Sequence, residues 1–432
     1  MRKLFATGAL LLVGSCSGES GVGPCACAVP TVSATAAWGG SEVIVTSPDF
    51  IGPDTVPVVL ARAETLAVRA VGPESIAVML PSNDDAFELS LKMRGGAEMR
   101  TPSIRVYGFL GESNLPEISG AMEPYPYAGN PVGLAYYHGQ VARINLRTNA
   151  VAPFGSSADT GYSTGCMMGP VVSVQGPDRI TVGRGGCRAY VLDVATMALV
   201  DTGPLFNSAF SAINVGPGRW IASRKNLQFV QTAPGTSYDD PCGEGWGFIV
   251  APAPQTAIVS INCDARSGTA AVPVWDRGTL QHQYMIAATR KIEAGAFSGS
   301  GDTLYVLGRT SAGSLPAIWA VNSATGAVLD SALIDSLGDI NAMAIDAARG
   351  RLYVAEGSFY AGKPFTMRVY DLPHLARRAT MRLPSPVQVT GDYRLQLWRL
   401  IVGADGILYQ AMTSWFDPVD QPPMLYRWSL LP

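Results

Sequence analysis

The stretch Gly301-Asp302-Thr303-Leu304-Tyr305-Val306 decides the fold of this chain, because the chain repeats it. A polar turn is followed by a Leu-Tyr strand, and the same phrase returns as Arg349-Gly350-Arg351-Leu352-Tyr353-Val354 and as Ala404-Asp405-Gly406-Ile407-Leu408-Tyr409. Gly and Asp favour tight turns, whereas Leu, Tyr and Val favour strands. The repetition predicts several copies of one strand-rich unit, joined by short turns.

A second phrase marks another strand of each unit. It is an apolar strand that ends in Asp or Asn and precedes a polar turn. Successive copies lie 48, 83, 46 and 49 residues apart, and the 83-residue gap fits two units with a degenerate copy near Phe229-Val230-Gln231. Tyr426-Arg427-Trp428-Ser429 supplies a seventh copy. The five clear copies are Arg143-Ile144-Asn145, Val191-Leu192-Asp193, Val274-Trp275-Asp276, Ala320-Val321-Asn322 and Val369-Tyr370-Asp371.

Seven units with several strands each and no helix predict an all-β fold, with a seven-bladed β-propeller over residues 100–432. A four-stranded sheet cannot bury both of its faces alone, but sheets packed radially bury them against their neighbours. The ring has to be closed, because an open ring exposes faces and edges. The chain ends in the third strand of a unit, so we expect the isolated strand at Ser103–Phe109 to complete the last blade.

The two phrases resemble the blades of YVTN/YncE-like and NHL-like propellers, in which a Leu-Tyr-Val strand and a following Asp are typical. Trp275-Asp276 occurs once and no Gly-His pair recurs with it, so this dipeptide is not enough to predict a WD40 protein. We interpret the Leu-Tyr and Val-x-Asp residues as packing and turn residues rather than as ligand-binding residues.

Composition agrees with an all-β chain. Charged residues make up 15% of the 432 residues, and the chain holds 47 Gly and 31 Pro. Coiled coils, helical bundles and acidic disordered chains need more charge and fewer backbone breakers, so these classes are excluded. The net charge of −3 provides no field that would attract nucleic acid.

The N-terminus predicts export and a lipid anchor. Arg2 and Lys3 precede an apolar segment, Leu4–Val13, that is too short to span a bilayer. Val13-Gly14-Ser15-Cys16 resembles the lipobox of bacterial lipoproteins. The resemblance implies a signal peptide over residues 1–15, lipidation of Cys16 and a tether over residues 16–27. The protein would then be anchored in the cell envelope, at the outer membrane or the periplasmic face, and would contact the membrane only through lipid. The alternative is an ordinary secretory signal with a chance cysteine.

Cysteine usage fits an oxidising compartment, because six cysteines remain beside Cys16. Two pairs each have a spacing of 21 residues, and each interval contains two strand-like runs around a turn. We predict a disulfide across each hairpin. A four-cysteine zinc site would need Cys-x-x-Cys pairs, which the chain lacks. The pairing of Cys25 and Cys27 stays open, and the predicted disulfides are Cys166–Cys187 and Cys242–Cys263.

Residues 28–97 predict a small β-sandwich of short alternating strands. The Gly39-Gly40 turn, the Val43-Ile44-Val45 strand and the Asp49-Phe50 corner resemble an IPT/TIG immunoglobulin-like domain. The resemblance implies a spacer or a contact surface. Pro57 limits the run Val56–Leu60 to an edge strand.

Catalytic and metal-binding motifs are missing from the sequence. The three histidines, His138, His282 and His374, have no acidic residue at a fixed offset. Gly161-Tyr162-Ser163-Thr164-Gly165 matches the nucleophile elbow, but the following Cys166–Pro170 cannot open the helix which that motif requires. No cofactor is expected.

Long loops carry aromatic and acidic residues that together suit a binding surface for a protein or a glycan. Alternatively, the aromatic side chains fold back and plug the loops. We expect a non-catalytic binding or scaffolding platform; a propeller hydrolase or lactonase with a metal or carboxylate site in the central channel is the alternative, and a purely structural envelope component is a third. No nucleic acid partner is expected. The candidate binding residues are Tyr238, Asp239, Asp240, Trp246, Phe359, Tyr360, Trp415, Phe416 and Asp417.

Overall fold

A computed structural model gives the architecture of residues 28–432 with gaps at the connecting segments. The residues outside the description are 1–27, 51–56, 94–97, 116–117, 128–129, 138–139, 154–170, 175–178, 184–187, 194–197, 206–210, 217–218, 224–226, 232–246, 252–255, 262–271, 280–281, 287–288, 290, 310–315, 335–339, 358–365, 383–394 and 415–423. The described residues form strands and turns and contain no helix, which confirms the all-β fold class. The chain divides into two compact units, one of residues 1–81 and 85–106 and the other of residues 82–84 and 107–432.

The first unit contains three small sheets. One has the order β1 (Thr31–Val32), β3 (Glu42–Thr46), β7 (Ser75–Met79), β6 (Val68–Gly72). The second has the order β10 (Glu98–Arg100), β9 (Leu89–Lys92), β4 (Val58–Ala61), β5 (Glu64–Thr65). The third has the order β2 (Ala36–Trp38), β11 (Ile104–Tyr107), β8 (Asp85–Phe87).

One core joins these sheets. Val43 and Val45 of β3, Val59 of β4 and Leu91 of β9 are at most 1% exposed and belong to the same hydrophobic cluster. Alternate residues of these strands point inward, as expected for sheets with one buried face. The expected edge position for the run after Val56 is wrong: β4 starts directly after Pro57 and lies between β9 and β5. Because Pro57 precedes the strand, its missing N–H removes no bond from the ladder.

The second unit contains seven sheets among its described residues, and in six of them the strands follow one another in the chain. The first three are β13–β16 (Ile118–Tyr127, Asn130–Tyr137, Gln140–Asn145, Val151–Pro153), β17–β20 (Val171–Val174, Arg179–Gly183, Arg188–Asp193, Leu199–Leu205) and β21–β23 (Ser211–Gly216, Arg219–Ser223, Leu227–Gln231). Next come β24–β27 (Gly247–Val250, Ala257–Ile261, Val272–Asp276, His282–Ile286), β28–β31 (Lys291–Phe297, Thr303–Arg309, Pro316–Asn322, Val328–Leu333) and β32–β35 (Ile340–Asp346, Arg351–Gly357, Thr366–Asp371, Ala376–Arg382). The last has the order β12 (Phe109–Asn114), β38 (Met424–Ser429), β37 (Ile407–Ser414), β36 (Leu395–Val402).

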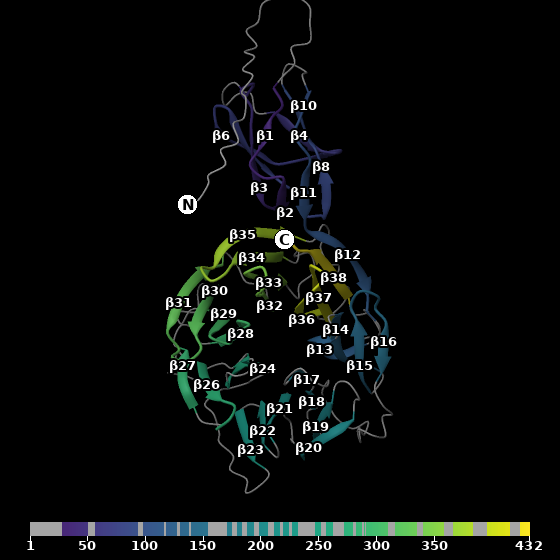
Figure 1. Cartoon of the computed structure of the whole chain (residues 1–432), viewed down its shortest axis with the longest axis vertical. Helices are drawn as coiled ribbons and strands as arrows, with labels where there is room; N and C mark the ends of the chain where they lie inside the picture. Colours follow the sequence, from purple (N-terminus) through teal and green to yellow (C-terminus); the bar gives the residue numbers. More distant parts are fainter. Residues whose placement is uncertain are drawn as a thin grey trace, which may run out of the picture. The chain divides into compact units, whose positions relative to one another are not determined.

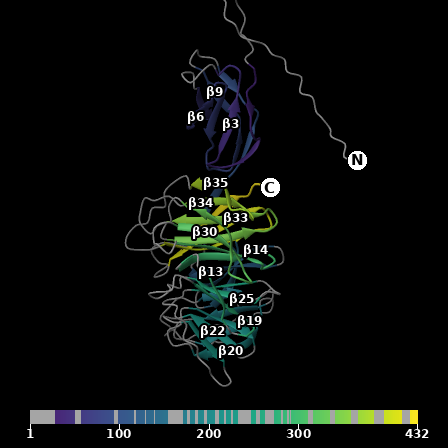
Figure 2. The same cartoon turned by 90° about the vertical axis from the view of Figure 1, so that its left-hand side faces the viewer.

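These sheets stand side by side in a closed ring (Figure 1). The first strand of each sheet touches the first strand of the next, in the sequence β13, β17, β21, β24, β28, β32 and β36, and β36 touches β13 in turn. The fourth strands lie on the outer circumference. Seen edge-on, strands such as β30 and β33 run across the ring from one face to the other (Figure 2). This radial packing of sheets is the β-propeller arrangement.

Both recurring phrases fall on the strands expected from their spacing. The Leu-Tyr phrase lies on the second strands β29, β33 and β37, where Leu304, Leu352 and Leu408 are 0% exposed. The Val-x-Asx phrase lies at the ends of the third strands, and the degenerate copy near Phe229 is the third strand β23. The two predicted hairpins also form, because β17 pairs with β18 and β24 pairs with β25.

The strand that closes the ring differs from the expected one. Ile104–Tyr107 forms β11, which pairs with β8 in the first unit's sheets, and the closing strand is the following β12, which pairs Phe109 with Trp428. Ile104 is 0% exposed in the first unit's core, so the alternation in this strand serves that core. The Phe109 ring meets the Trp428 indole edge-on, with 5.4 Å between ring centroids.

Candidate functional site

The ring has two faces with different connections. Neighbouring strands within a sheet run antiparallel, so connections alternate between the two ends of the strands. The turns from first to second and from third to fourth strands lie on one face, the turn face, and include residues 298–302, 323–327, 347–350 and 403–406. The connections from second to third strands and from sheet to sheet lie on the other face, the loop face. Its described landmarks are the strand ends Gly357, Thr366, Ser414 and Met424.

The predicted site residues all lie outside the described residues. Phe359 and Tyr360 fall between β33 and β34, and Trp415, Phe416 and Asp417 fall between β37 and β38. Both segments therefore leave and re-enter the ring at the loop face. The segment with Tyr238, Asp239, Asp240 and Trp246 begins at the turn-face end of β23 and ends where β24 starts at the loop face. Cys16, Cys25, Cys27, Cys166, Cys187, Cys242 and Cys263 are likewise outside the description.

On the turn face, the recurring Asp or Asn closes the turn after the third strand. The Asn322 side-chain oxygen accepts bonds from the Ala324 and Thr325 backbone N–H groups, both at 3.0 Å, and from the Thr325 hydroxyl at 3.1 Å. Asp276 accepts equivalent bonds from the Thr279 N–H at 2.6 Å and hydroxyl at 3.0 Å. These contacts are local side-chain-to-backbone turns and confirm the interpretation of the phrase as structural.

The electrostatics of Asp276 follow from these bonds. Burial of the carboxylate opposes ionisation, but hydrogen bonds from Thr256 and Thr279 outweigh it and hold the pKa of Asp276 below its usual value. The carboxylate also accepts a bond from the Gln283 amide at 3.1 Å. All these hydrogen bonds are accepted by the Asp276 carboxylate, so the role of Asp276 is to stabilise the turn.

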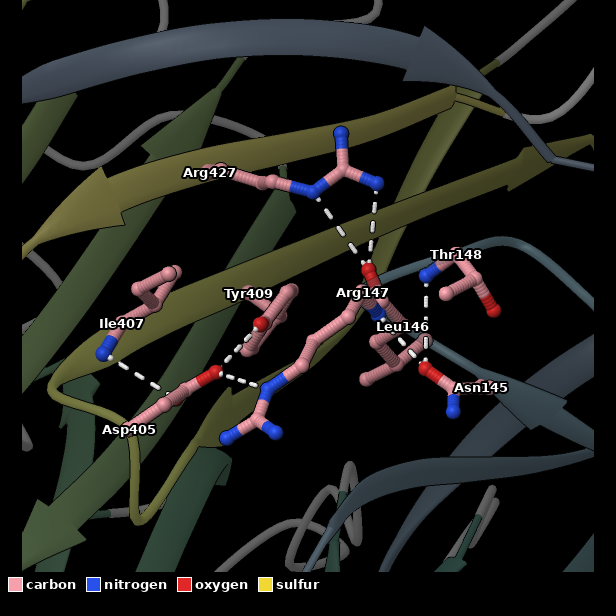
Figure 3. A network of polar contacts seen from close by, with 8 residues as sticks. All are labelled: Asn145, Leu146, Arg147, Thr148, Asp405, Ile407, Tyr409 and Arg427. Atoms are coloured by element: carbon pink, nitrogen blue, oxygen red, sulfur yellow. Dashed lines mark hydrogen bonds and ion pairs between the residues drawn. The ribbon is translucent and has the colours of Figure 1, made fainter.

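A polar network, the closure cluster of Arg147, Asp405, Tyr409 and Arg427, lies where the last sheet meets the first (Figure 3). Asp405 Oδ2 accepts a bond from Arg147 Nε at 2.6 Å and one from the Tyr409 hydroxyl at 2.8 Å. Asp405 lies in the turn between β36 and β37, and Arg147 lies in the turn after β15. The ion pair therefore connects two neighbouring sheets through residues that are 258 positions apart in sequence.

Arg427 of β38 strengthens the same junction. Its guanidinium donates to the Leu146 carbonyl at 3.1 and 3.3 Å, to the Ser113 hydroxyl at 2.8 Å and to the Asn149 side-chain oxygen at 3.0 Å. A planar guanidinium with several donors suits such a multiple contact. Sequence reasoning missed Arg427, because its partners are more than 270 residues away and no local motif marks it.

The closure cluster has no free reactive group. The bond to Asp405 raises the pKa of the Arg147 guanidinium, so Arg147 stays charged. Burial, reinforced by Asp405, raises the pKa of the Tyr409 hydroxyl, which therefore stays neutral. Arg147 and Tyr409 both donate to one carboxylate. The closure cluster therefore has a structural role: it holds the last sheet against the first.

At the loop-face end of β33 and β34, a charged pair is buried. Arg368 Nη2 and Glu356 Oε1 are 2.7 Å apart, and the two side chains are 5% and 10% exposed. In the neighbouring sheet, Arg309 Nε lies 3.2 Å from Glu293 Oε1. Glu356, Arg368 and Glu293 make further contacts as well. A buried ion pair of this kind fixes the ends of β33 and β34 that flank residues 358–365. Replacing one partner alone would destabilise the fold by about 3 to 5 kcal/mol, because the other charge would stay buried and unpaired.

A groove of about 370 Å³ lies on the first unit. Three cations and two carboxylates line it, so both signs of charge are present. The Ser90 hydroxyl donates to Glu98 at 2.8 Å, and this bond lowers the pKa of the Glu98 carboxyl. The lining residues are Leu60, Arg62, Ala86, Phe87, Glu88, Ser90, Lys92, Glu98 and Arg100.

Metal and membrane features were sought in the described part of the chain. No cluster of three His, Cys, Asp or Glu side chains there could hold a metal ion. The described residues also include no apolar helix of membrane-spanning length. Of the histidines, His374 lies exposed in the turn after β34, and His138 is outside the description.

Comparison with known proteins supports the fold. No protein-family model and no curated protein matches the chain. Among solved structures, a chain of the crystallised mitotic checkpoint complex is similar over 78% of this chain and 96% of its own length, with a TM-score of 0.53 and 13% identity. The Cps50 (Swd1) β-propeller domain of Myceliophteria thermophila is similar over 74% of this chain and 100% of its own length, with a TM-score of 0.50 and 10% identity. At this identity the likeness shows the β-propeller fold alone.

Proposed function

We propose that this protein is a cell-envelope lipoprotein whose propeller is a non-catalytic platform for a protein or glycan partner. In this proposal Cys16 carries the lipid and residues 16–27 form the tether. The first unit, through Val106, forms an IPT/TIG-like immunoglobulin-fold spacer, and the second unit, from Tyr107 onward, forms a seven-bladed propeller. The seven sheets in the second unit and the common core of the first unit's sheets support this division.

The observation that carries the proposal is the topology of the loop face. The strand ends at Gly357, Thr366, Ser414 and Met424 open toward one side of two neighbouring sheets. The segments between them contain Phe359, Tyr360, Trp415, Phe416 and Asp417. Aromatic residues supplied by adjacent loops are typical of protein and sugar binding surfaces. Both solved neighbours belong to the same structural class, and one of them comes from a crystallised protein complex, which favours a protein partner.

Two disulfides complete the proposed loop face. β17 starts at Val171 and β19 at Arg188, so Cys166 and Cys187 precede strands that both begin on this side. Gly247 of β24 pairs with Ile261 of β25, and Cys242 and Cys263 flank this pair. Peptide mapping without reduction should recover Cys166–Cys187 and Cys242–Cys263. Recovery of all four as free thiols would reject these bridges.

Site-specific photocross-linking in intact cells tests the platform. A photoreactive amino acid replaces Phe359 or Trp415 on the proposed binding face, and Thr325 on the turn face is the matched control. We expect one recurrent adduct from the loop-face positions and none from Thr325. Equal adducts from both faces, or none from the loop face together with no signal on a glycan array, would overturn the platform. A stoichiometric divalent ion in the purified protein would favour the hydrolase or lactonase alternative instead.

Lipidation needs its own test. Labelling with an alkyne fatty acid should modify the wild-type chain but not the Cys16→Ser variant. On cell fractionation, the Cys16→Ser variant should move from the membrane fraction to the soluble fraction. Equal labelling of both proteins would reject a lipid on Cys16 and leave the binding platform standing.

A further inference from the structure

The chain passes between its two units three times, although one link is enough to join two successive domains. The crossings follow Pro81, Asp84 and Val106, because residues 82–84 belong to the second unit while the residues on both sides of them belong to the first. Residues 82–84, the strap, are therefore a piece of the second unit that lies within the sequence of the first. Domains joined by a simple linker do not share such a segment.

The first unit holds the chain at both ends of the strap. Leu80, just before the strap, is 2% exposed, and Phe87, just after it, is 6% exposed; both belong to the hydrophobic cluster of the first unit. The backbone is held as well. The Leu80 N–H donates to the Ser41 carbonyl at 2.9 Å, and Asp85 of β8 pairs with Val106 of β11. The ends of the strap are therefore fixed only while the first unit is folded.

Within the second unit, the strap binds the strand that closes the ring. Phe109, the first residue of β12, donates from its N–H to the Ser82 carbonyl at 2.8 Å and accepts the Asp84 N–H at 2.9 Å. Asn83 forms a parallel bridge with the same residue. The Ser82 hydroxyl accepts a bond from the Arg382 N–H of β35 at 3.3 Å. The strap is thus bonded to the outer strands of two neighbouring sheets.

The same end of β12 carries the pairing that closes the ring. The Gly108 carbonyl accepts the Ser429 N–H, and the Gly108 N–H donates to the Ser429 hydroxyl, both at 2.8 Å. β12 is the outermost strand of its sheet, so β38 is its neighbour on one side and the strap is its neighbour on the other at Phe109. Without the strap, the start of β12 would be held by β38 alone.

We propose that the strap makes closure of the ring depend on the folded state of the first unit. When the first unit unfolds, Leu80 and Phe87 leave their cluster, the strap is released, and β12 loses its outer neighbour. Packed side chains and backbone hydrogen bonds that connect two parts of a protein carry energetic coupling between them. The first unit then controls the conformation of the propeller, which goes beyond the role of a spacer and does not require the proposed binding platform.

Hydrogen exchange of the full chain, resolved to single amides, tests the coupling. The reporters are the N–H groups of Phe109, which donates to the strap, and of Ser429, which donates to Gly108. Leu91→Ala weakens the core of the first unit, where Leu91 is 0% exposed. We expect both reporters to exchange at least about tenfold faster, because truncating a buried leucine raises the open population of its unit by that factor or more. Val45→Ala, in the same core, replaces Leu91→Ala if that variant does not fold.

A decoupled chain separates the strap from other effects of the core substitution. It carries one flexible Gly/Ser spacer after Pro81 and another after Asp84, so that unfolding of the first unit no longer displaces the strap. The matched control chain carries the same two spacers in exposed turns, one after Ala63 in the first unit and one after Gly299 in the second.

We expect the core substitution to accelerate Ser429 exchange in the control chain and to change it by less than about twofold in the decoupled chain, which is the margin for independent sites. Spacers that by themselves expose Ser429 in the decoupled chain, but not in the control chain, would also support the strap. Two results would overturn the proposal. In one, the substitution speeds exchange in β9 of the otherwise unaltered chain and leaves Ser429 unchanged; in the other, it accelerates Ser429 equally in the decoupled and control chains.

Discussion

Gly108 is the position at which one added methyl group tests the ring closure most directly. A Cβ atom on Gly108 would lie 2.1 Å from the Ser82 carbonyl oxygen and 2.9 Å from the Ser82 carbonyl carbon. Both are backbone atoms, so the chain itself has to shift. Three hydrogen bonds of 2.8 Å depend on its present course: Ser429 N to Gly108 O, Gly108 N to Ser429 Oγ, and Phe109 N to Ser82 O.

The expected cost of Gly108→Ala follows from these contacts. Each hydrogen bond contributes about 1 kcal/mol net, so disrupting all three removes about 3 kcal/mol from the free energy of unfolding. The lost flexibility of the unfolded chain returns about 0.4 to 1 kcal/mol for a Gly→Ala change. We therefore expect a net destabilisation of about 2 to 3 kcal/mol.

Urea unfolding followed by circular dichroism measures this change. The control is Gly299→Ala in the same unit, where the new Cβ would meet the Ala347 methyl at 3.5 Å, an ordinary van der Waals contact. We expect the control to stay within about 0.5 kcal/mol of the wild type. Two results would contradict this reasoning: Gly108→Ala unfolds at the wild-type urea concentration, or both variants lose the same stability. Either would show that the close approach of Gly108 to Ser82 does not stabilise the closed ring.

Three further outcomes test other parts of the fold. Replacing Arg427 with Met should lower the free energy of unfolding by about 2 to 3 kcal/mol, because a charged donor of several bonds is lost, whereas Arg378→Met on an exposed edge should change it by less than about 0.5; equal effects would contradict the role of the closure cluster. Asn322→Ala should cost about 1 kcal/mol in thermal or urea unfolding through the loss of its turn, and an unchanged stability would show that the turn forms without the side chain. Burial raises the pKa of Tyr353 and Tyr426 above the ordinary value of 10.0, so their neutral forms stabilise the fold below that pH and the stability falls as the pH rises further. The part of the phenolate absorbance that the variant with both Tyr353→Phe and Tyr426→Phe lacks should therefore appear together with the loss of β structure, and its appearance in the intact fold would refute the burial argument.

The repeating strands could be predicted from sequence because their determinants are local. Leu304 and Tyr305 of β29 alternate with the pleat, and Gly301 adopts a φ of 76° in the turn before them. The Asx residues at the ends of third strands were also visible, although the Thr three positions later, which donates to Asn322 and to Asp276, was not recognised. Because this turn is local, its residues keep a fixed spacing of three positions between Asx and Thr, which a sequence can reveal.

The closure was predicted in principle but misplaced in detail. Ser103–Phe109 and the next segment both have alternating patterns, and the pattern alone does not tell which sheet each strand joins. Arg427 could not be assigned, because its partners come together only in the folded ring. The aromatic loop residues stay a prediction, since the strand ends locate their anchors and the residues themselves lie outside the description.

The pairing of β12 with β38 also sets the order of events during synthesis. The Gly108 backbone is bonded to a residue 321 positions further along, so the nascent chain carries β12 without its partner until almost all later sheets have emerged from the ribosome. Contacts this distant in sequence form slowly and leave strand edges open meanwhile. A product truncated before β38 keeps those edges open permanently, so premature termination should yield the aggregating species of this protein.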